Sequence, residues 1–245
     1  MPDIPPLPHL RLRAVTLARA GRTVLDGLEL DADVRRLGVV GRNGSGKSTL
    51  ARVIAGLMEP DAGTVRLDGI DPARDRKAAL GAVGILFQNP DHQIIFPTVV
   101  EEMAFGLAQQ GRRKRAAETE ARDWLARFGR AHWADVAVAT LSQGQKHLVC
   151  LMAVLAMRPR LLVLDEPFAG LDLPTRMQLG RALDRHEGGV VHISHEPEDL
   201  AACDRVLWLD AGRIRAEGAR AAVLPAYLAE MRRIGAGDDL DHLAH

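Results

Sequence analysis

Residues 41–49, which read GRNGSGKST, carry the clearest chemistry in the sequence. They fit the pattern G-x-x-x-x-G-K-[ST], in which glycines let successive backbone N–H groups turn into one cavity that binds phosphate. Lys47 is predicted to reach the β- and γ-phosphate oxygens of a nucleotide, and the Ser48 hydroxyl to ligate Mg²⁺. A glycine-rich turn without a ligand is the weaker alternative, because it requires neither Lys47 nor Ser48. The predicted nucleotide-binding residues of this P-loop are Gly41, Asn43, Gly44, Ser45, Gly46, Lys47, Ser48 and Thr49, and the loop alone does not say which kind of nucleotide enzyme this is.

A pair of acids follows a continuous apolar run later in the chain. Residues 161–164 read LLVL and precede Asp165 and Glu166, which is the arrangement called Walker B. Asp165 is predicted to hold Mg²⁺, usually through water, and Glu166 to polarise the attacking water as a general base. Two surface acids in a strand-to-loop turn would not need the apolar run before them.

Gln88 and His195 follow two other apolar runs. The carboxyl ends of neighbouring parallel strands meet at one edge of a sheet, so both side chains are expected near the γ-phosphate. A single histidine at a strand end is usually structural, but several independent features here converge on the same edge. His192, inside its run, is predicted to be structural.

The elements that must position these residues can be read from hydrophobic periodicity and turn residues. An antiparallel start is expected, with a turn at residues 20–22, followed by an α/β chain with βαβ units. Strands are expected at residues 10–17, 24–34, 37–40, 64–67, 83–87, 161–164, 190–194 and 206–209. Helices are expected at residues 49–57, 99–109, 112–128 and 143–157.

These elements predict one domain at residues 10–234, preceded by an N-terminal extension at 1–9. Within the domain, residues from about 89 to 158 are expected to form an inserted helical lobe. Residues 235–245 contain Gly, Asp and His and are expected to be a mobile tail. The histidines of this tail are too few to predict a metal site.

The composition restricts the partners and the compartment. Lys plus Arg and Asp plus Glu both total 32, so no overall basic field favours nucleic acid, and no nucleic-acid partner is expected. Cys150 and Cys203 lack metal-ligand or C-x-x-C spacing and are predicted to be buried, reduced thiols, consistent with a reducing cytosol. Neither an N-terminal apolar region nor an uninterrupted apolar run of about 18 residues is present, so secretion and membrane spanning are not expected.

Residues 141–145, LSQGQ, lie between the helical lobe and Walker B and complete a set of ordered motifs. With the P-loop, Gln88, Asp165-Glu166, Asp172 and His195, the chain resembles the nucleotide-binding subunit of ATP-binding-cassette (ABC) transporters over residues 10–225. The resemblance implies an α/β fold of the P-loop NTPase class: an ABC-type nucleotide-binding domain with a RecA-like core, an antiparallel β subdomain and a helical subdomain. It also implies an ATPase that uses ATP and Mg²⁺.

The resemblance further implies roles for residues that act between subunits. A second ATPase, either the same chain or a paralogue, is implied as a head-to-tail partner, with ATP between the two. Asp172 corresponds to the loop that couples the two sites, and His195 to the histidine that clamps the γ-phosphate. Gln88 corresponds to the residue that senses the γ-phosphate, Mg²⁺ and a transmembrane partner. The signature segment that acts on the partner's ATP corresponds to Ser142, Gln143, Gly144 and Gln145.

Two positions depart from the family pattern. Gln143 stands where the signature usually has its second glycine, a variable position at which activity is expected to survive. Arg19 stands about where an adenine-stacking aromatic residue is expected. A guanidinium can also stack on a base, so Arg19 is predicted to contact the adenine of bound ATP.

Residues 87–99 and 101–106 resemble a narrower group, the ATPases of energy-coupling-factor (ECF) importers of vitamins or of cobalt and nickel ions. The signature helix looks most like the biotin branch, with the cobalt branch close to it. This resemblance implies a transmembrane coupling subunit and a substrate-binding membrane subunit as partners, and a cytoplasmic location at the inner face of the membrane. Two alternatives remain: a soluble ABC protein acting on nucleic acid or ribosomes, and a binding module with an inactive site.

Overall fold

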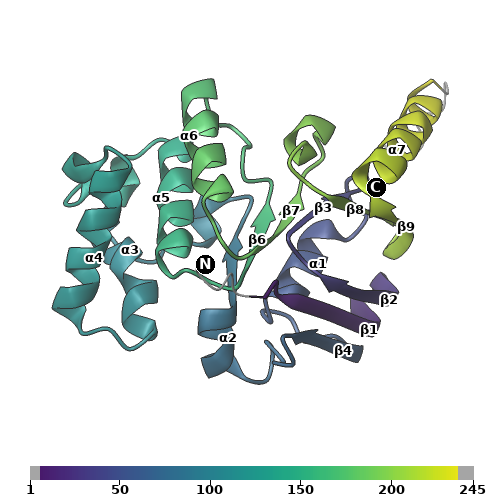
Figure 1. The fold of residues 1–245 in the computed structure, drawn as a ribbon, viewed down its shortest axis with the longest axis horizontal. Helices are drawn as coiled ribbons and strands as arrows, with labels where there is room; N and C mark the ends of the chain where they lie inside the picture. Colours follow the sequence, from purple (N-terminus) through teal and green to yellow (C-terminus); the bar gives the residue numbers. More distant parts are fainter. Residues whose placement is uncertain (1–5, 237–245) are drawn as a thin grey trace.

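The computed structural model describes residues 6–236, which form two β-sheets and the helices packed around them (Figure 1). The smaller sheet is antiparallel and has the strand order β2-β1-β4. Its central strand alternates buried leucines with outward-facing residues, the pattern of a sheet with one buried face. These strands are β1 (His9–Arg19), β2 (Arg22–Asp33) and β4 (Ala62–Leu67).

The larger sheet has the strand order β5-β6-β7-β3-β8-β9. Its first five strands are parallel to one another, and β9 pairs with β8 in the antiparallel direction. Every residue of β6 and β7 is buried, which explains why the sequence of these strands is almost continuously apolar. The strands are β3 (Arg36–Val40), β5 (Val83–Leu86), β6 (Leu161–Asp165), β7 (Gly189–Ile193), β8 (Arg205–Asp210) and β9 (Arg213–Ala219).

Three helices, α3, α4 and α5, lie together at one side of the larger sheet (Figure 1). Their buried side chains form one hydrophobic cluster, which includes Met103, Leu125 and Leu151. The side chains of α1, β1 and β3 form another, on the side of the smaller sheet. The helices of the first cluster are α3 (Val99–Gln109), α4 (Lys114–Arg127) and α5 (Gln143–Ala156), with short 3₁₀ helices at Pro90–His92, Ala131–Trp133 and Val138–Thr140.

Each of the remaining helices follows a strand along the chain. They are α1 (Lys47–Ile54), α2 (Arg76–Ala82), α6 (Leu173–Asp184), the 3₁₀ helix Pro197–Leu200 and α7 (Arg220–Gly235). No helix between residues 6 and 236 is long and apolar enough to cross a bilayer. Cys150 and Cys203 are buried and free, as predicted.

Some predicted boundaries were wrong. The helix after the P-loop begins at Lys47 and ends at Ile54, not at residue 57. It stops there because Gly56 has φ of +70° and packs so closely that a Cβ would lie 2.3 Å from the Pro72 carbonyl. Gly235, the first residue of the predicted mobile tail, is the last residue of α7. The rest of that prediction falls at residues 237–245, outside the described part of the chain.

Candidate functional site

The strand order of the larger sheet brings the predicted site residues to one edge. Strands β5, β6, β7 and β3 are adjacent and parallel, so their carboxyl ends lie side by side (Figure 1). Gln88 follows β5, Asp165 ends β6, His195 follows β7, and the P-loop follows β3. A ligand held at the P-loop therefore faces side chains from three neighbouring strands.

The P-loop needs glycine at two positions for different reasons. At Gly41 a Cβ would lie 2.2 Å from the Leu209 carbonyl oxygen, so only glycine allows the loop to approach β8 this closely. Gly46 caps α1 with φ of +102°, a conformation that other residues rarely adopt. A Cβ there would also lie 2.8 Å from the Val24 carbonyl oxygen of β2. The loop is thus fixed between the two sheets.

Several polar groups of the P-loop have no partner within residues 6–236. The backbone N–H groups of Gly46, Lys47 and Ser48 donate to no backbone carbonyl there. Ser45 is 3% exposed, and its buried hydroxyl oxygen also has no hydrogen-bond partner. Unpaired N–H groups at the N-terminus of a helix form an anion-binding site. The loop therefore fits a phosphate chain.

The Lys47 ammonium lies within the loop. Its Nζ donates to the carbonyl oxygens of Gly41, at 2.8 Å, and Arg42, at 2.9 Å. Burial lowers the pKa of Lys47, while the charges of Glu166 and Asp165 act to raise it. Since Arg42 and Gly41 supply only carbonyl dipoles, a phosphate would be a stronger partner for this charge.

Asp165 and Ser48 face each other across the sheet edge. Asp165 is 5% exposed, and this burial raises the pKa of its carboxyl, whereas the hydrogen bond from Ser48 lowers it. A buried carboxylate beside a hydroxyl supplies the hard oxygen ligands that Mg²⁺ prefers. The two residues fit the predicted metal site.

Glu166 is held in a fixed orientation by the end of β7. It is 6% exposed, has φ of +52°, and donates its N–H to the Ile193 carbonyl at 3.0 Å. Its Oε1 accepts the backbone N–H of His195 at 2.9 Å and lies 2.8 Å from His195 Nδ1. The hydrogen bond to Glu166 raises the pKa of His195, and the smaller effect of burial lowers it. A left-handed conformation at a non-glycine residue is unfavourable, which is common at functional positions.

Ser194, which the sequence reasoning did not single out, connects this pair to its surroundings. It is fully buried, and its Oγ lies 3.3 Å from Glu166 Oε2 and 3.0 Å from Asp199 Oδ2. Asp199 in turn pairs with Arg176 of α6. The hydroxyl also accepts the N–H of Glu196 at 3.1 Å. The sequence contained one signal for this role, because Ser194 is a small polar residue between the apolar run of β7 and His195.

Gln88 and Arg19, two of the predicted site residues, are exposed on the surface. Gln88 is exposed just after the carboxyl end of β5. Arg19 is exposed at the end of β1, where its Nη1 donates to the Ala18 carbonyl at 2.8 Å and lies 4.0 Å from Asp61 Oδ1. Its contact with adenine stays a prediction.

The signature segment forms the start of α5. Ser142 is the N-cap, its hydroxyl accepts the N–H of Gln145 at 3.3 Å, and the Gln145 side chain accepts the Ser142 N–H at 2.8 Å. This reciprocal capping box leaves the first turn rigid. Helix α5 packs in the cluster of α3 and α4, whereas α1 of the P-loop packs in the other cluster. The segment therefore belongs to a different part of the fold from the chain's own P-loop.

Asp172 is the N-cap of α6. Its Oδ1 accepts the N–H of Thr175 at 2.9 Å, and the bonds from Thr175 lower its pKa. A capping role is thus visible in the structure. The coupling role implied by the family resemblance stays a prediction.

An ionic contact that the sequence reasoning missed joins the segment after Gln88 to the signature helix. Asp91 accepts hydrogen bonds from Gln143 Nε2 and from Lys146 Nζ, both at 2.8 Å. Both bonds lower the pKa of Asp91, and the bond from Lys146 has the larger effect. We call this contact the Asp91 clip. It could not be read from the sequence, because Asp91 and Lys146 are 55 positions apart.

The chain is similar to known proteins along most of its length. The family model described as ABC transporter matches residues 28–169. The chain is 51% identical over 220 residues to the biotin transport ATP-binding protein BioM of Rhodobacter capsulatus, covering 90% of this chain and 94% of the relative. It is 40% identical to the energy-coupling factor transporter ATP-binding protein EcfA1 of Symbiobacterium thermophilum, covering 80% and 71%. The solved structure of cbiO1 from Clostridium perfringens, part of the complex cbiONQ, matches with a TM-score of 0.72 at 27% identity, covering 96% and 97%.

Proposed function

Because the chain belongs to the ABC transporter family and is an ATP-binding subunit with the ABC ATPase fold, we propose that it powers an ECF-type importer of a micronutrient, with biotin favoured. The observation that carries the ATPase chemistry is the meeting of Lys47, Asp165, Glu166 and His195 at one sheet edge. The observation that favours biotin is the 51% identity to a biotin transport ATP-binding protein over 90% of the chain.

In the proposed mechanism, the chain's own groups bind the nucleotide and move one proton. The N–H groups of residues 46–48 and the Lys47 ammonium bind the phosphates, and Ser48 with Asp165 holds Mg²⁺. Mg²⁺, when bound, would neutralise the negative charge that develops on the phosphate oxygens. Glu166 accepts the proton of the attacking water as general base.

His195 has two partners in this proposal. Without nucleotide, its ring pairs with Glu166, as the 2.8 Å contact supports. With ATP bound, the ring turns to the γ-phosphate and Glu166 is released toward the water. The side chain of His195 is 55% exposed, which leaves it room to change partner. Gln88 approaches from β5 and completes the ring of residues around the γ-phosphate.

The proposed active form is a head-to-tail dimer of this chain, or of this chain and a paralogue. Ser142, Gln143, Gly144 and Gln145 would contact the ATP of the partner subunit. Support comes from the packing of α5, whose buried side chains lie in a different hydrophobic cluster from those of α1. We assign residues 10–234 to one ATPase domain, with a helical subdomain at about 89–158.

The proposed site for the membrane partner is the segment after the Asp91 clip. Ile95 is 69% exposed and Phe105 is 37% exposed, and the Phe96 and Phe105 rings pair with centroids 5.0 Å apart. Glu102 fixes this segment by accepting the N–H groups of Ile95, at 2.8 Å, and Phe96, at 2.9 Å. An exposed apolar group on a rigid support suits a transmembrane coupling subunit at the inner face of the membrane.

Substrate uptake tests the proposed transport role. Cells in which the native copy carries Lys47→Ala should lose most uptake of labelled biotin, while cobalt and nickel uptake stay at the wild-type level. Loss of cobalt or nickel uptake instead would assign the chain to the second candidate branch. Unchanged uptake of all three would contradict the micronutrient role, and salt-sensitive binding of the purified chain to nucleic acid would then favour the soluble alternative.

A further inference from the structure

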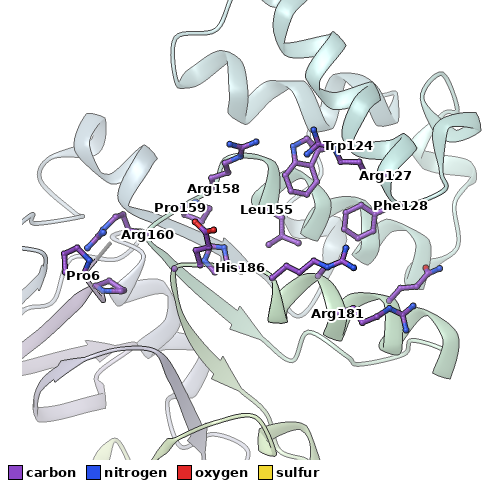
Figure 2. A pocket seen from close by; sticks show the side chains of 16 residues that line it. Pro6, Trp124, Arg127, Phe128, Leu155, Arg158, Pro159, Arg160, Arg181 and His186 are labelled. Atoms are coloured by element: carbon purple, nitrogen blue, oxygen red, sulfur yellow. The ribbon is translucent and has the colours of Figure 1, made fainter. Parts of the chain in front are cut away.

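A cavity of about 640 Å³ lies away from the P-loop, between the helical cluster and the core. Its walls come from the C-terminal parts of α4, α5 and α6 and from the loops that lead into β6 and β7. It therefore lies at the amino ends of these strands, opposite the edge that holds Asp165 and His195. Figure 2 shows Pro6 and Arg160 at one end of the view, Phe128 and Arg181 at the other, and Leu155 and His186 between them.

Five arginines line this cavity, in a chain whose net charge is zero. Arg160 is paired with Asp68 at 2.9 Å. The other four make no ion pair and no side-chain hydrogen bond within residues 6–236. These are Arg127, Arg158, Arg181 and Arg185.

The surrounding structure does not balance these four charges. The cavity has one acid, Glu187, and the ends of three helices, each equivalent to about half a negative charge. An excess of about 1.5 positive charges remains in a concave site, where the field is concentrated. His186 adds no charge near neutral pH, because burial and the nearby Arg36 lower its pKa to about 4.

One wall of the cavity is apolar. The rings of Trp124 and Phe128 are stacked, with centroids 6.1 Å apart and planes at 22°. Arg127 lies over the Trp124 ring, 5.7 Å from its centroid, and Leu155 and Pro159 extend the apolar surface. A guanidinium held on an aromatic face keeps its planar donor groups available for an oxyanion.

We propose that this cavity binds an organic phosphate, a small molecule that carries one phosphate group and an apolar ring. A phosphate monoester has about −1.5 to −2 charges at pH 7, which matches the excess positive charge. The volume lies within the range of about 300–1,000 Å³ that small-molecule sites occupy. The ring contacts Trp124 and Phe128, and the phosphate contacts Arg181 in α6 and Arg185 at its C-cap. Because it touches both α4 and α6, the ligand connects a helix of the inserted lobe to the helix that follows β6.

Flavin mononucleotide is a suitable probe, because it has one phosphate and a planar ring, and riboflavin is its neutral counterpart. Binding is measured by flavin fluorescence anisotropy with Mg²⁺ and a saturating non-hydrolysable ATP analogue present, so that the P-loop is filled. We expect flavin mononucleotide to bind and riboflavin not to bind. The variant Arg181→Ala/Arg185→Ala should weaken binding by at least about tenfold, the effect of losing charge-assisted hydrogen bonds.

The matched control is Arg74→Ala/Arg122→Ala, which removes two arginines that are paired with Glu59 and Asp135 outside the cavity. This control should bind the probe as the wild type does, and thermal unfolding should confirm that both variants are folded. Two results would overturn the proposal: no binding of the flavin mononucleotide while the ATP analogue fills the P-loop, or equal binding by the two double variants. Inorganic phosphate that binds as tightly as the probe would also overturn it, because the ring would then contribute nothing.

Discussion

At the scale of single residues, Glu166 is held by contacts that would have to change before it can act as a base. Its Oε1 is shared between the N–H and the ring of His195. Asp165 and Lys47 lie near enough to affect each other's titration through Coulomb interactions. The site therefore combines buried charges of both signs, and a change to one charge should affect the others.

Replacing Glu166 by Gln should remove turnover and leave ATP binding intact. The amide has nearly the same shape as the carboxylate, so the phosphate contacts remain, but it cannot accept the proton of water. We expect ATP turnover to fall by about 10²–10⁴-fold, the usual contribution of a general base. Equilibrium binding of labelled ATP measures the second part. Turnover within a few fold of wild type would rule Glu166 out as the base.

The same substitution should change the titration of His195. The hydrogen bond to Glu166 raises the pKa of His195 above its ordinary value of 6.5. The stabilising contact is fully present below pH 6.5 and is lost as the pH rises through the raised pKa. NMR titration of the histidine ring without nucleotide should therefore give a lower pKa in Glu166→Gln than in the wild type. An unchanged pKa would show that the pair does not exist in solution.

Gly41 should be intolerant of even a methyl group. Gly41→Ala would place its Cβ 2.2 Å from the Leu209 carbonyl oxygen, so the loop or β8 must move. We expect unfolding free energy to fall by about 1–3 kcal/mol, as for overpacked sites, together with weaker ATP binding. Gly81→Ala is the control, because nothing lies within 4 Å of its Cβ position in α2. Denaturant unfolding of both variants measures the difference, and equal stabilities would contradict the packing argument.

At the scale of elements, the Asp91 clip fixes the segment after Gln88 to the first turn of α5. In the proposed mechanism, it links the segment after Gln88, the residue proposed to approach the chain's own ATP, to the helix proposed to contact the ATP of the partner subunit. Since Asp91 is 45% exposed at its side chain, the clip should contribute little to stability. We expect its main effect to be on turnover, because it fixes the position of the segment after Gln88 relative to α5.

Asp91→Ala should therefore lower ATP turnover while the melting temperature stays nearly unchanged. Lys146→Ala should do the same, and the double variant should be no worse than either single variant, because both remove one contact. Asp135→Ala is the control, since it breaks the exposed Arg122–Asp135 pair in the same helical cluster. Steady-state ATPase assays distinguish the cases. Equal losses in Asp91→Ala and Asp135→Ala would mean that the clip has no specific role.

Most elements that position the site could be predicted from the sequence. For each element that was missed, the structure gives a physical reason. Strands β6 and β7 are buried on both faces, so their apolar runs are unambiguous. Strand β9 reads RIRAEGA and was missed, because an edge strand with mostly exposed side chains has little apolar signal. Helix α7 contains Pro225 and was also missed. Contacts such as the Asp91 clip depend on tertiary packing and have no local signature.

At the scale of the whole molecule, the two hydrophobic clusters separate the parts of the ATPase. Helix α1, which follows the P-loop, packs in the cluster that includes the smaller sheet, and α5, which begins at the signature segment, packs in the cluster of α3 and α4. In the proposed mechanism, a single chain supplies one half of each of two sites. Completion of either site by a second subunit is the central claim of the proposed mechanism.

The most direct test is the mass of Glu166→Gln in solution, measured by size-exclusion chromatography with light scattering, with and without Mg²⁺ and ATP. This variant is expected to bind ATP without hydrolysing it, so the closed form should accumulate. We predict a monomer without nucleotide and a dimer with Mg²⁺ and ATP, and Lys47→Ala should stay monomeric in both conditions. A mass that stays monomeric at saturating ATP, in a variant shown to bind ATP, would contradict the claim that ATP joins two copies of this chain.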